Sequence, residues 1–285
     1  MEEIGSTSQN PQMITESKPC KGCGQTFDIR APMNANGTYA RILFRQEFCQ
    51  PCMDRQLRER EDADRQLRAA SLIFRRQEML ANSGIPPKFL NDSERLDGFQ
   101  DTGNEKTYAT ILEYAHAFPS MERPIGYPSL LVYGRNNGVG KTRLVCGIIR
   151  HLLESWSRDN RHQSPYLFVA MPDLRLQLQM GLRFQAERTA EMVYADCQSA
   201  WLLVLDDVGK EGLYRADDAE VYFKLINDRY NQQLPTIVTS NLAPDKPWVK
   251  GGLCLADIMG LAAMSRLKEM CRSRVVEVRG EDRRG

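Results

Sequence analysis

The chain has no excess of charge of either sign, little histidine or tryptophan, and no hydrophobic run long enough to cross a bilayer. Lysine and arginine number 38 against 37 acidic residues, so composition does not indicate a general nucleic-acid-binding protein, and any DNA contact must come from a local basic face. The richest apolar stretch, residues 252–264, is too short for a transmembrane helix and contains Asp257. The acidic start Met1-Glu2-Glu3 predicts that there is no secretory signal peptide. We therefore expect a cytoplasmic protein with one sizeable domain and a small accessory domain.

Residues 134–142, GRNNGVGKT, have the composition of a phosphate-binding loop. The apolar run Leu130–Tyr133 predicts a buried strand before the loop, and the spacing of Leu144, Ile148 and Leu152 predicts a helix after it. The start of a helix offers unpaired N–H groups and a positive dipole end to anionic oxygens. We therefore expect a lysine contact to the β- and γ-phosphates, a threonine contact to Mg²⁺, and nucleotide binding by Gly138, Val139, Gly140, Lys141 and Thr142.

The loop departs from the pattern G-x-x-x-x-G-K-[ST] at its first glycine. That position is Arg135, and the nearest glycine, Gly134, lies one residue earlier. Either the loop carries one extra residue, or Arg135 replaces the glycine. A plain Gly/Asn-rich turn between a strand and a helix is the alternative interpretation of the segment.

Two further apolar strands are predicted to end in polar side chains. Residues 201–207, WLLVLDD, resemble a Walker B strand, in which Asp206 would hold the Mg²⁺ shell and Asp207 would orient the attacking water. A buried strand that happens to end in acids is the alternative. After a predicted helix over 217–230, the predicted strand over 235–241 ends in Asn241, which resembles the arrangement of an AAA+ sensor 1. An ordinary asparagine at a strand end is the alternative.

Four of the eight cysteines form two Cys-x-x-Cys pairs: Cys20, Cys23, Cys49 and Cys52. Two thiolates two residues apart bind one tetrahedral ion from the same turn, and two such pairs predict a closed structural Zn²⁺ site. Strands over 26–30 and 39–44, with a turn at 34–37, predict a hairpin between the pairs, as in a treble-clef or zinc-ribbon module. A redox pair or four free thiols are the alternatives. The single cysteines Cys146, Cys197, Cys254 and Cys271 are expected in the core.

Composition divides the chain into four segments. We predict a disordered polar tail over 1–18, the zinc module over 19–58, a charged helical linker over 59–83, and the ATPase domain over 84–285. The last boundary falls at Ser83-Gly84-Ile85, ahead of two prolines that no helix crosses.

Five segments together resemble the DnaC/IstB family of AAA+ ATPases: GIPPKF over 84–89, the phosphate loop, LLVLDDVGKE over 202–211, INDRY over 226–230, and LPTIVTSNL over 234–242. The resemblance covers roughly residues 84–285 and excludes the cysteine segment. It implies an α/β P-loop NTPase core with a parallel sheet and no separate helical lid. The short remainder of the chain after Asn241 agrees with a missing lid.

The resemblance also implies roles for residues outside the nucleotide strands. Arg266 matches the family's arginine finger, which acts on a neighbouring subunit and so implies a self-associated oligomer. Arg284 matches a terminal arginine sometimes treated as sensor 2. In related loaders the helical region over 173–198 faces a central channel, where single-stranded DNA would meet Arg175, Arg183, Phe184 and Arg188.

The implied function is that of an ATP-dependent loader of a replicative DNA helicase in DNA replication, with ATP, Mg²⁺ and Zn²⁺ as bound groups. Turnover is expected to be slow, because Asp207 is one methylene shorter than the usual glutamate. Two alternatives stay open: an IstB-like helper ATPase of transposition, and a nucleotide-binding adaptor that does not hydrolyse ATP.

Overall fold

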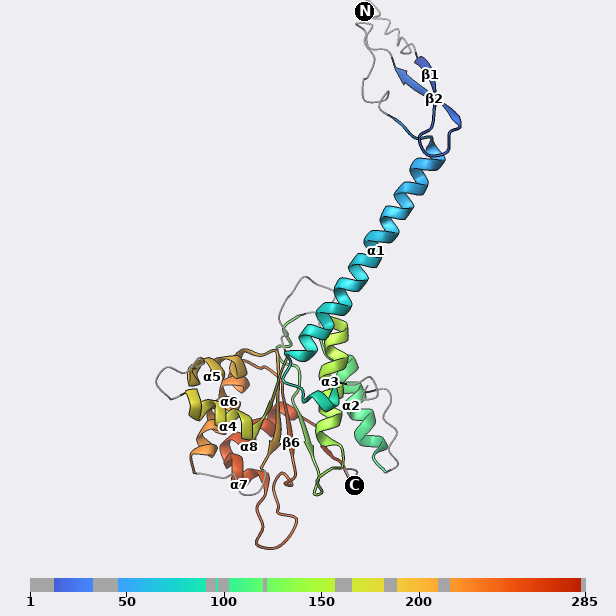
Figure 1. Ribbon diagram of the computed structural model, residues 1–285. Coiled ribbons are helices and arrows are strands. Elements are labelled where there is room, and N and C mark those ends of the chain that lie inside the picture. Colours follow the sequence, from blue (N-terminus) through green and yellow to red (C-terminus); the bar gives the residue numbers. More distant parts are fainter. Residues whose placement is uncertain are drawn as a thin grey trace, which may run out of the picture. The chain divides into compact units, whose positions relative to one another are not determined.

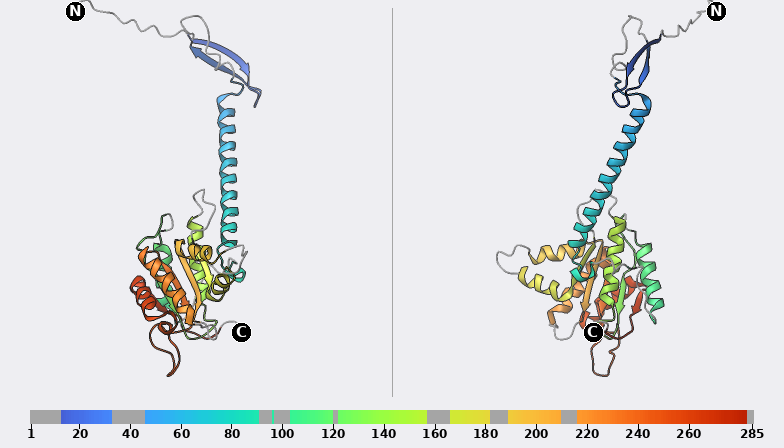
Figure 2. Two further views of the ribbon diagram at one scale, coloured as in Figure 1. Left: turned by 90° about the vertical axis from the view of Figure 1, so that its left-hand side faces the viewer. Right: turned by 45° about the vertical axis from the view of Figure 1, so that its right-hand side comes forward.

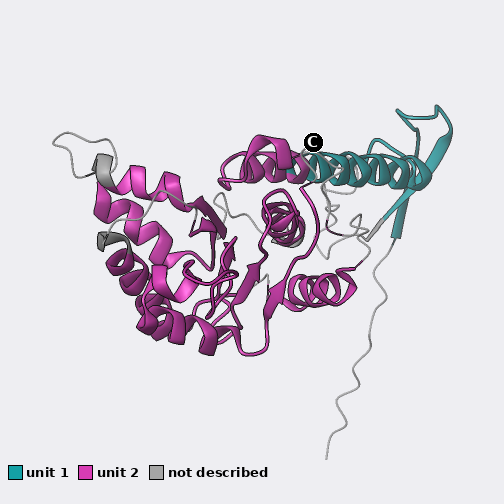
Figure 3. Cartoon of the chain, turned by 90° about the horizontal axis from the view of Figure 1, so that it is seen from below, with its two compact units in different colours: residues 1–71 teal, residues 72–285 magenta. Residues whose placement is uncertain are grey.

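A computed structural model describes residues 13–32, 46–90, 96, 103–119, 122–156, 166–181, 189–209 and 216–282. The chain forms two compact units, residues 1–71 and 72–285 (Figure 3). Four predicted site residues lie outside the described residues: Arg183, Phe184, Arg188 and Arg284.

The N-terminal unit contains an antiparallel pair of strands, β1 (Met13–Pro19) and β2 (Thr26–Pro32). The tail predicted over 1–18 is therefore wrong for residues 13–18, which lie in β1. Its polar composition does not oppose a strand here, because the tight turn after it sets the register: Cys20 N–H donates to Gln25 O, and Gly24 N–H donates to Cys20 O, both at 2.9 Å. The second strand of the predicted hairpin, residues 39–44, lies outside the described residues.

Helix α1 (Gln50–Ala81) is continuous across the boundary between the two units. After Pro51 it contains no glycine or proline, and it is rich in Arg, Gln, Glu, Leu and Ala, which favour helix. It ends just before Gly84, whose φ of +80° suits glycine and ends the helical path. The predicted charged helix is present, although it begins at the second cysteine pair.

The C-terminal unit is built on one parallel sheet (Figure 1). Its five strands lie in the order β4-β5-β6-β3-β7. They are β3 (Leu130–Tyr133), β4 (Tyr166–Ala170), β5 (Leu202–Val208), β6 (Thr236–Ser240) and β7 (Val275–Glu277). The three central strands, β5, β6 and β3, are buried along almost their whole length, as expected for strands covered on both faces.

Helices cover both faces of the sheet (Figures 1 and 2). Alternate strand residues enter different cores: Leu130 and Val132 pack with α2 (Glu105–Ala117) and α3 (Lys141–Trp156), whereas Leu131 points to the opposite face. That face carries α4 (Met171–Gly181), α5 (Ala190–Ser199), α6 (Ala216–Asn231), α7 (Leu255–Met259) and α8 (Leu261–Cys271). The predicted α/β fold is confirmed, and in the part of the chain that the structure describes no helix follows β7.

A fully buried arginine joins α5 to the sheet. Arg229 of α6 donates from Nη1 to the carbonyl oxygens of Cys197, Gln198 and Ala200, at 2.9, 3.1 and 2.8 Å. It also donates to Thr236 Oγ1 at 2.8 Å and to Pro235 O. Burial lowers the pKa of Arg229 to about 9, so it stays charged at neutral pH and interacts with the negative end of α5.

The remaining cysteines have the predicted structural role, because all four are buried: Cys146, Cys197, Cys254 and Cys271. Among the described residues, no helix combines the length and hydropathy that a membrane span needs.

Candidate functional site

The phosphate loop joins β3 to α3 at the carboxyl edge of the sheet. Gly138 and Gly140 have φ of +70° and +104°, values that glycine adopts without strain. Lys141 is the first residue of α3, and its side chain is folded back under the loop. Its Nζ donates to Gly134 O at 3.1 Å and to Asn136 O at 2.8 Å. The loop therefore encloses a buried ammonium group beside a helix N-terminus, which is an anion-binding arrangement.

Gly134 has a steric role that the loop pattern does not show. A Cβ at this position would lie 2.2 Å from Val278 O, so only glycine allows the backbone of the segment after β7 to approach this closely. Val278 N–H in turn donates to Tyr133 O at 2.7 Å. Close backbone packing thus accounts for the glycine at position 134.

Asp206 lies at the end of β5 and receives hydrogen bonds from two threonines. Thr142 Oγ1 donates to the carboxylate, with oxygens 3.0 Å apart, and Thr239 Oγ1 donates to Asp206 Oδ1 at 2.6 Å. Burial raises the pKa of Asp206 above its ordinary value, while the Thr239 and Thr142 hydroxyls act in the opposite direction. Thr142 and Asp206 thus place hard oxygen ligands of the kind Mg²⁺ prefers beside the phosphate loop.

Asp207 occupies a backbone conformation that is uncommon for a non-glycine residue. Its φ is +56°, at a register shift between Leu205 and Val208 where β5 pairs with β6. Asp207 N–H donates to Thr239 Oγ1 at 3.0 Å. The irregularity turns Asp207 away from the regular strand path, and Thr239 connects the two acids.

Asn241 follows β6 and contacts the phosphate loop directly. Its Nδ2 donates to Asn137 Oδ1 at 2.9 Å, and its carbonyl oxygen accepts from Trp248 Nε1 at 2.8 Å. Trp248 also stacks on Tyr133, the last residue of β3, with ring centroids 6.0 Å apart. The structure therefore brings four predicted residues to one edge of the sheet: Lys141, Thr142, Asp206 and Asn241.

Sequence reasoning missed Thr239, Asn136 and Asn137. Thr239 gave no distinct signal, because Thr236 and Ser240 of the same strand also carry hydroxyl groups. The asparagines were visible only as turn residues. Asn136 nevertheless provides an acceptor for Lys141, and Asn137 provides one for Asn241.

The predicted arginines lie in different surroundings. Arg266 of α8 is half-buried, and its guanidinium lies 5.2 Å from the ring centroid of Phe223 and 5.9 Å from that of Tyr230. Both rings belong to α6, so two aromatic faces orient this cation. Arg175 of α4 is half-buried; the other three predicted DNA-contacting residues are not described.

The two cysteine pairs form a compact cluster in the N-terminal unit. The sulfurs of Cys20, Cys23, Cys49 and Cys52 all lie within 4.8 Å of one another. In a tetrahedral site with Zn–S bonds of about 2.3 Å, sulfurs are about 3.8 Å apart, so this donor set fits Zn²⁺. A Cβ on Gly22 would lie 3.1 Å from Cys52 Sγ, which explains the small residue in the first turn.

Backbone N–H groups prepare Cys20 as a thiolate. Gly22 N–H and Cys49 N–H donate to Cys20 Sγ at 3.3 and 3.2 Å. Burial raises the pKa of Cys20, but the N–H groups of Cys49, Cys23 and Gly22 together outweigh burial and lower it to about 6. Hydrogen bonds from Cys49 and Cys23 instead raise the pKa of Cys52 to about 12, and the pKa of Cys49 is also raised. A metal-binding cysteine must be deprotonated, so it is the close packing of the four sulfurs that fits a metal site.

Comparison with known proteins shows what the C-terminal unit is similar to. No protein-family model matches the chain. The replicative helicase loader DnaI of Bacillus subtilis is 30% identical over 152 residues. The crystal structure of the DnaC helicase loader matches with a TM-score of 0.53 and 22% identity, covering 68% of this chain and 100% of that one. The core of the C-terminal unit has a DnaC-like fold.

The DnaC-like core also matches the crystal structure of DnaI, with a TM-score of 0.51 and 21% identity over 70% of this chain and 95% of that one. The predicted resemblance to DnaC-like AAA+ proteins is confirmed. The sequence match to DnaI spans 48% of this chain and 45% of that protein, so about half of each is aligned.

Proposed function

We propose that the DnaC-like core binds and hydrolyses ATP. The observation that carries this proposal is the convergence of Lys141, Thr142, Asp206 and Asn241 at one edge of the sheet. A structural turn and an unrelated acidic strand end would not place a buried lysine, a threonine–carboxylate pair and a loop-bound asparagine together. Mg²⁺, held by Thr142 and Asp206, would neutralise charge on the β- and γ-phosphate oxygens.

In this proposal the side chains hold the phosphates and the attacking water in position and form no covalent bond to them. Lys141 leaves its loop carbonyls for phosphate oxygens, Asp207 accepts a hydrogen bond from the attacking water, and Asn241 orients that water or the γ-phosphate. The shorter carboxylate and strained backbone of Asp207 support slow turnover.

Arg266 is the proposed trans-acting finger. Stacking on Phe223 and Tyr230 would orient its guanidinium as a cation for a neighbouring subunit. ATP binding would then assemble an oligomer whose sites are completed between subunits. Arg284 is proposed to contact the same nucleotide from the chain terminus.

We further propose that the protein loads a replicative helicase on DNA. The similarity to DnaI supports this role, and single-stranded DNA would be held by Arg175, Arg183, Phe184 and Arg188. The cysteine cluster, with bound Zn²⁺, would form the module over 19–58 and be joined through the linker over 59–83 to the ATPase domain over 84–285. A cytoplasmic location follows from this role.

The ATPase proposal is tested by steady-state hydrolysis with matched variants. We expect slow Mg²⁺-dependent turnover that is lost in Lys141→Ala and reduced at least tenfold in Asp207→Asn. Mixing Arg266→Ala protein with Lys141→Ala protein should restore activity, because each contributes the intact part of a shared site. Equal turnover by wild type and Asp207→Asn would instead support the adaptor.

The loader proposal is tested by capture on immobilised full-length protein. We expect the host's replicative helicase to be retained with ATP and Mg²⁺, and helicase transfer to a single-stranded DNA circle to depend on Lys141. Retention of a transposase without helicase would favour the IstB-like alternative. Comparing wild type with Cys20→Ser/Cys23→Ser shows whether the zinc module takes part in capture.

A further inference from the structure

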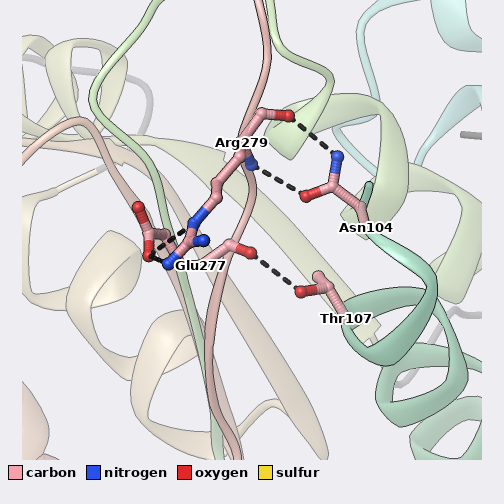
Figure 4. A network of polar contacts seen from close by, with 4 residues as sticks. All are labelled: Asn104, Thr107, Glu277 and Arg279. Atoms are coloured by element: carbon pink, nitrogen blue, oxygen red, sulfur yellow. Dashed lines mark hydrogen bonds and ion pairs between the residues drawn. The ribbon is translucent and has the colours of Figure 1, made fainter. Parts of the chain in front are cut away.

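The end of β7 and the segment after it are fastened to the start of α2 by hydrogen bonds (Figure 4). Thr107 Oγ1 donates to Glu277 O at 2.8 Å. Asn104 makes two bonds with the backbone of Arg279: its Nδ2 donates to Arg279 O, and its Oδ1 accepts from Arg279 N–H, both at 2.8 Å. A paired amide contact of this kind fixes the direction of the segment as well as its position.

Asn104 is committed to this contact rather than to its own helix. It precedes α2 in the N-cap position, where asparagine usually accepts from the helix N–H groups, but it makes no side-chain cap bond. Asn104 is also buried, with only 5% of its surface exposed. The start of α2 therefore serves as an anchor for residues 277–280.

The phosphate loop itself holds the next part of the segment. Asn136 Nδ2 donates to Gly280 O at 2.7 Å, and Gly280 has φ of +142°, which suits glycine. The chain then brings the Asp282 side chain against Gly138. A Cβ built on Gly138 would lie 1.6 Å from Asp282 Oδ1, so the carboxylate lies directly beside the loop backbone.

We propose that Asp282 is an internal competitor for the nucleotide phosphates, placed on the loop by the anchored segment over 277–282. This inference rests on the proposed nucleotide binding by the same loop. A carboxylate is an anion of the kind that loop N–H groups and a helix N-terminus attract, and it occupies space beside Gly138 that a bound phosphate would need. Phosphate and Asp282 also repel each other, so both do not stay on the loop together.

The two arrangements form a two-state element. Only the population with Asp282 off the loop binds nucleotide at full strength, which lowers the apparent affinity by that fraction. The Asp282 side chain is exposed, so it can leave the loop while Asn104 still holds Arg279. Any partner that binds residues 280–282 away from the loop would strengthen nucleotide binding by the same linkage.

The test is equilibrium binding of a fluorescent ATP analogue with Mg²⁺ to the full chain. We expect Asp282→Asn to bind about tenfold more tightly than wild type, a difference of about 1.4 kcal/mol. Glu281→Gln is the matched control, because it removes the same charge from the neighbouring exposed residue, and it should bind within twofold of wild type. Lys141→Ala should not bind.

A second variant tests the anchor. Asn104→Ala should also tighten binding, and adding Asp282→Asn to it should give less than the sum of the two effects, because both remove one contact. If wild type binds the ATP analogue but Asp282→Asn binds it equally well or more weakly, the proposal that Asp282 competes with phosphate is wrong, while the proposed function stands. If no variant binds nucleotide, including wild type, the proposed function fails first.

Discussion

The Thr239 hydroxyl donates to Asp206 Oδ1 at 2.6 Å and accepts from the N–H of Asp207 at 3.0 Å. One side chain on β6 therefore positions both acids at the end of β5. We predict that Thr239→Val lowers kcat for ATP hydrolysis about tenfold or more, with a small change in KM, because binding groups stay while the acids lose their support. Steady-state kinetics provide the measurement.

Thr239→Ser is the control for that prediction, since it keeps the hydroxyl and loses only a methyl group. It should retain most of the wild-type kcat. Equal losses in the serine and valine variants would show that packing, and not the hydroxyl, determines the effect.

Asp206→Asn should stabilise the folded protein while abolishing hydrolysis. Burial raises the pKa of Asp206, so the folded state binds this proton more tightly than the unfolded chain. The stabilisation of the fold by this proton is fully present below about pH 4, the ordinary pKa of aspartate, and is lost as the pH rises through the raised pKa of Asp206. The variant lacks that loss, so at pH 7 we expect a free energy of unfolding higher by about 1 kcal/mol.

Urea unfolding at several pH values from 4 to 7 measures this difference. The gap between variant and wild type should widen as pH rises. A constant gap would show that removal of the Asp206 charge is not its cause.

The cysteine cluster should bind one Zn²⁺ per chain, measured by elemental analysis of the purified protein. Cys20→Ser and Cys52→Ser should each lose most of the metal, whereas Cys146→Ala, in the core of the other unit, should keep it. Chelation should abolish the ordered signals of residues 13–32 in an NMR spectrum, because a module this small has almost no apolar core of its own. Full metal content in the serine variants would contradict the site.

Arg229→Met should destabilise the DnaC-like core by about 4 kcal/mol, because several buried carbonyl oxygens lose their donor at once. Arg229→Lys should recover only part of this loss, since an ammonium group cannot reproduce the planar arrangement of donors. Urea unfolding monitored by circular dichroism is the measurement. Arg123→Lys, on the surface, should change stability by no more than about 0.5 kcal/mol.

The strands and their polar ends were predictable because they depend on local patterns. Apolar runs between turn residues identified β3, β5 and β6, and parallel strands bring their carboxyl ends to one edge. That rule is sufficient to predict that Thr142, Asp206 and Asn241 converge, as the structure confirms. The roles assigned to them stay predictions.

Contacts between distant segments were not predictable from such patterns. The need for glycine at Gly134 comes from the carbonyl of Val278, far along the chain, so the loop sequence alone suggested a misplaced glycine. The strand over 13–19 was missed for a related reason: its register depends on a turn and a partner strand, and its own composition is polar. Arg229 is likewise defined by carbonyls on α5 and near β6, which only the fold brings together.

The stacking of Trp248 on Tyr133 places an intrinsic fluorophore beside the phosphate loop. The indole N–H is bonded to Asn241 O, and the ring lies on the residue that leads into the phosphate loop. The chain has only three tryptophans, so a change at this indole is not lost among many others. If the proposed hydrolysis of ATP displaces Asn241, intrinsic fluorescence should follow that displacement in real time, without any label.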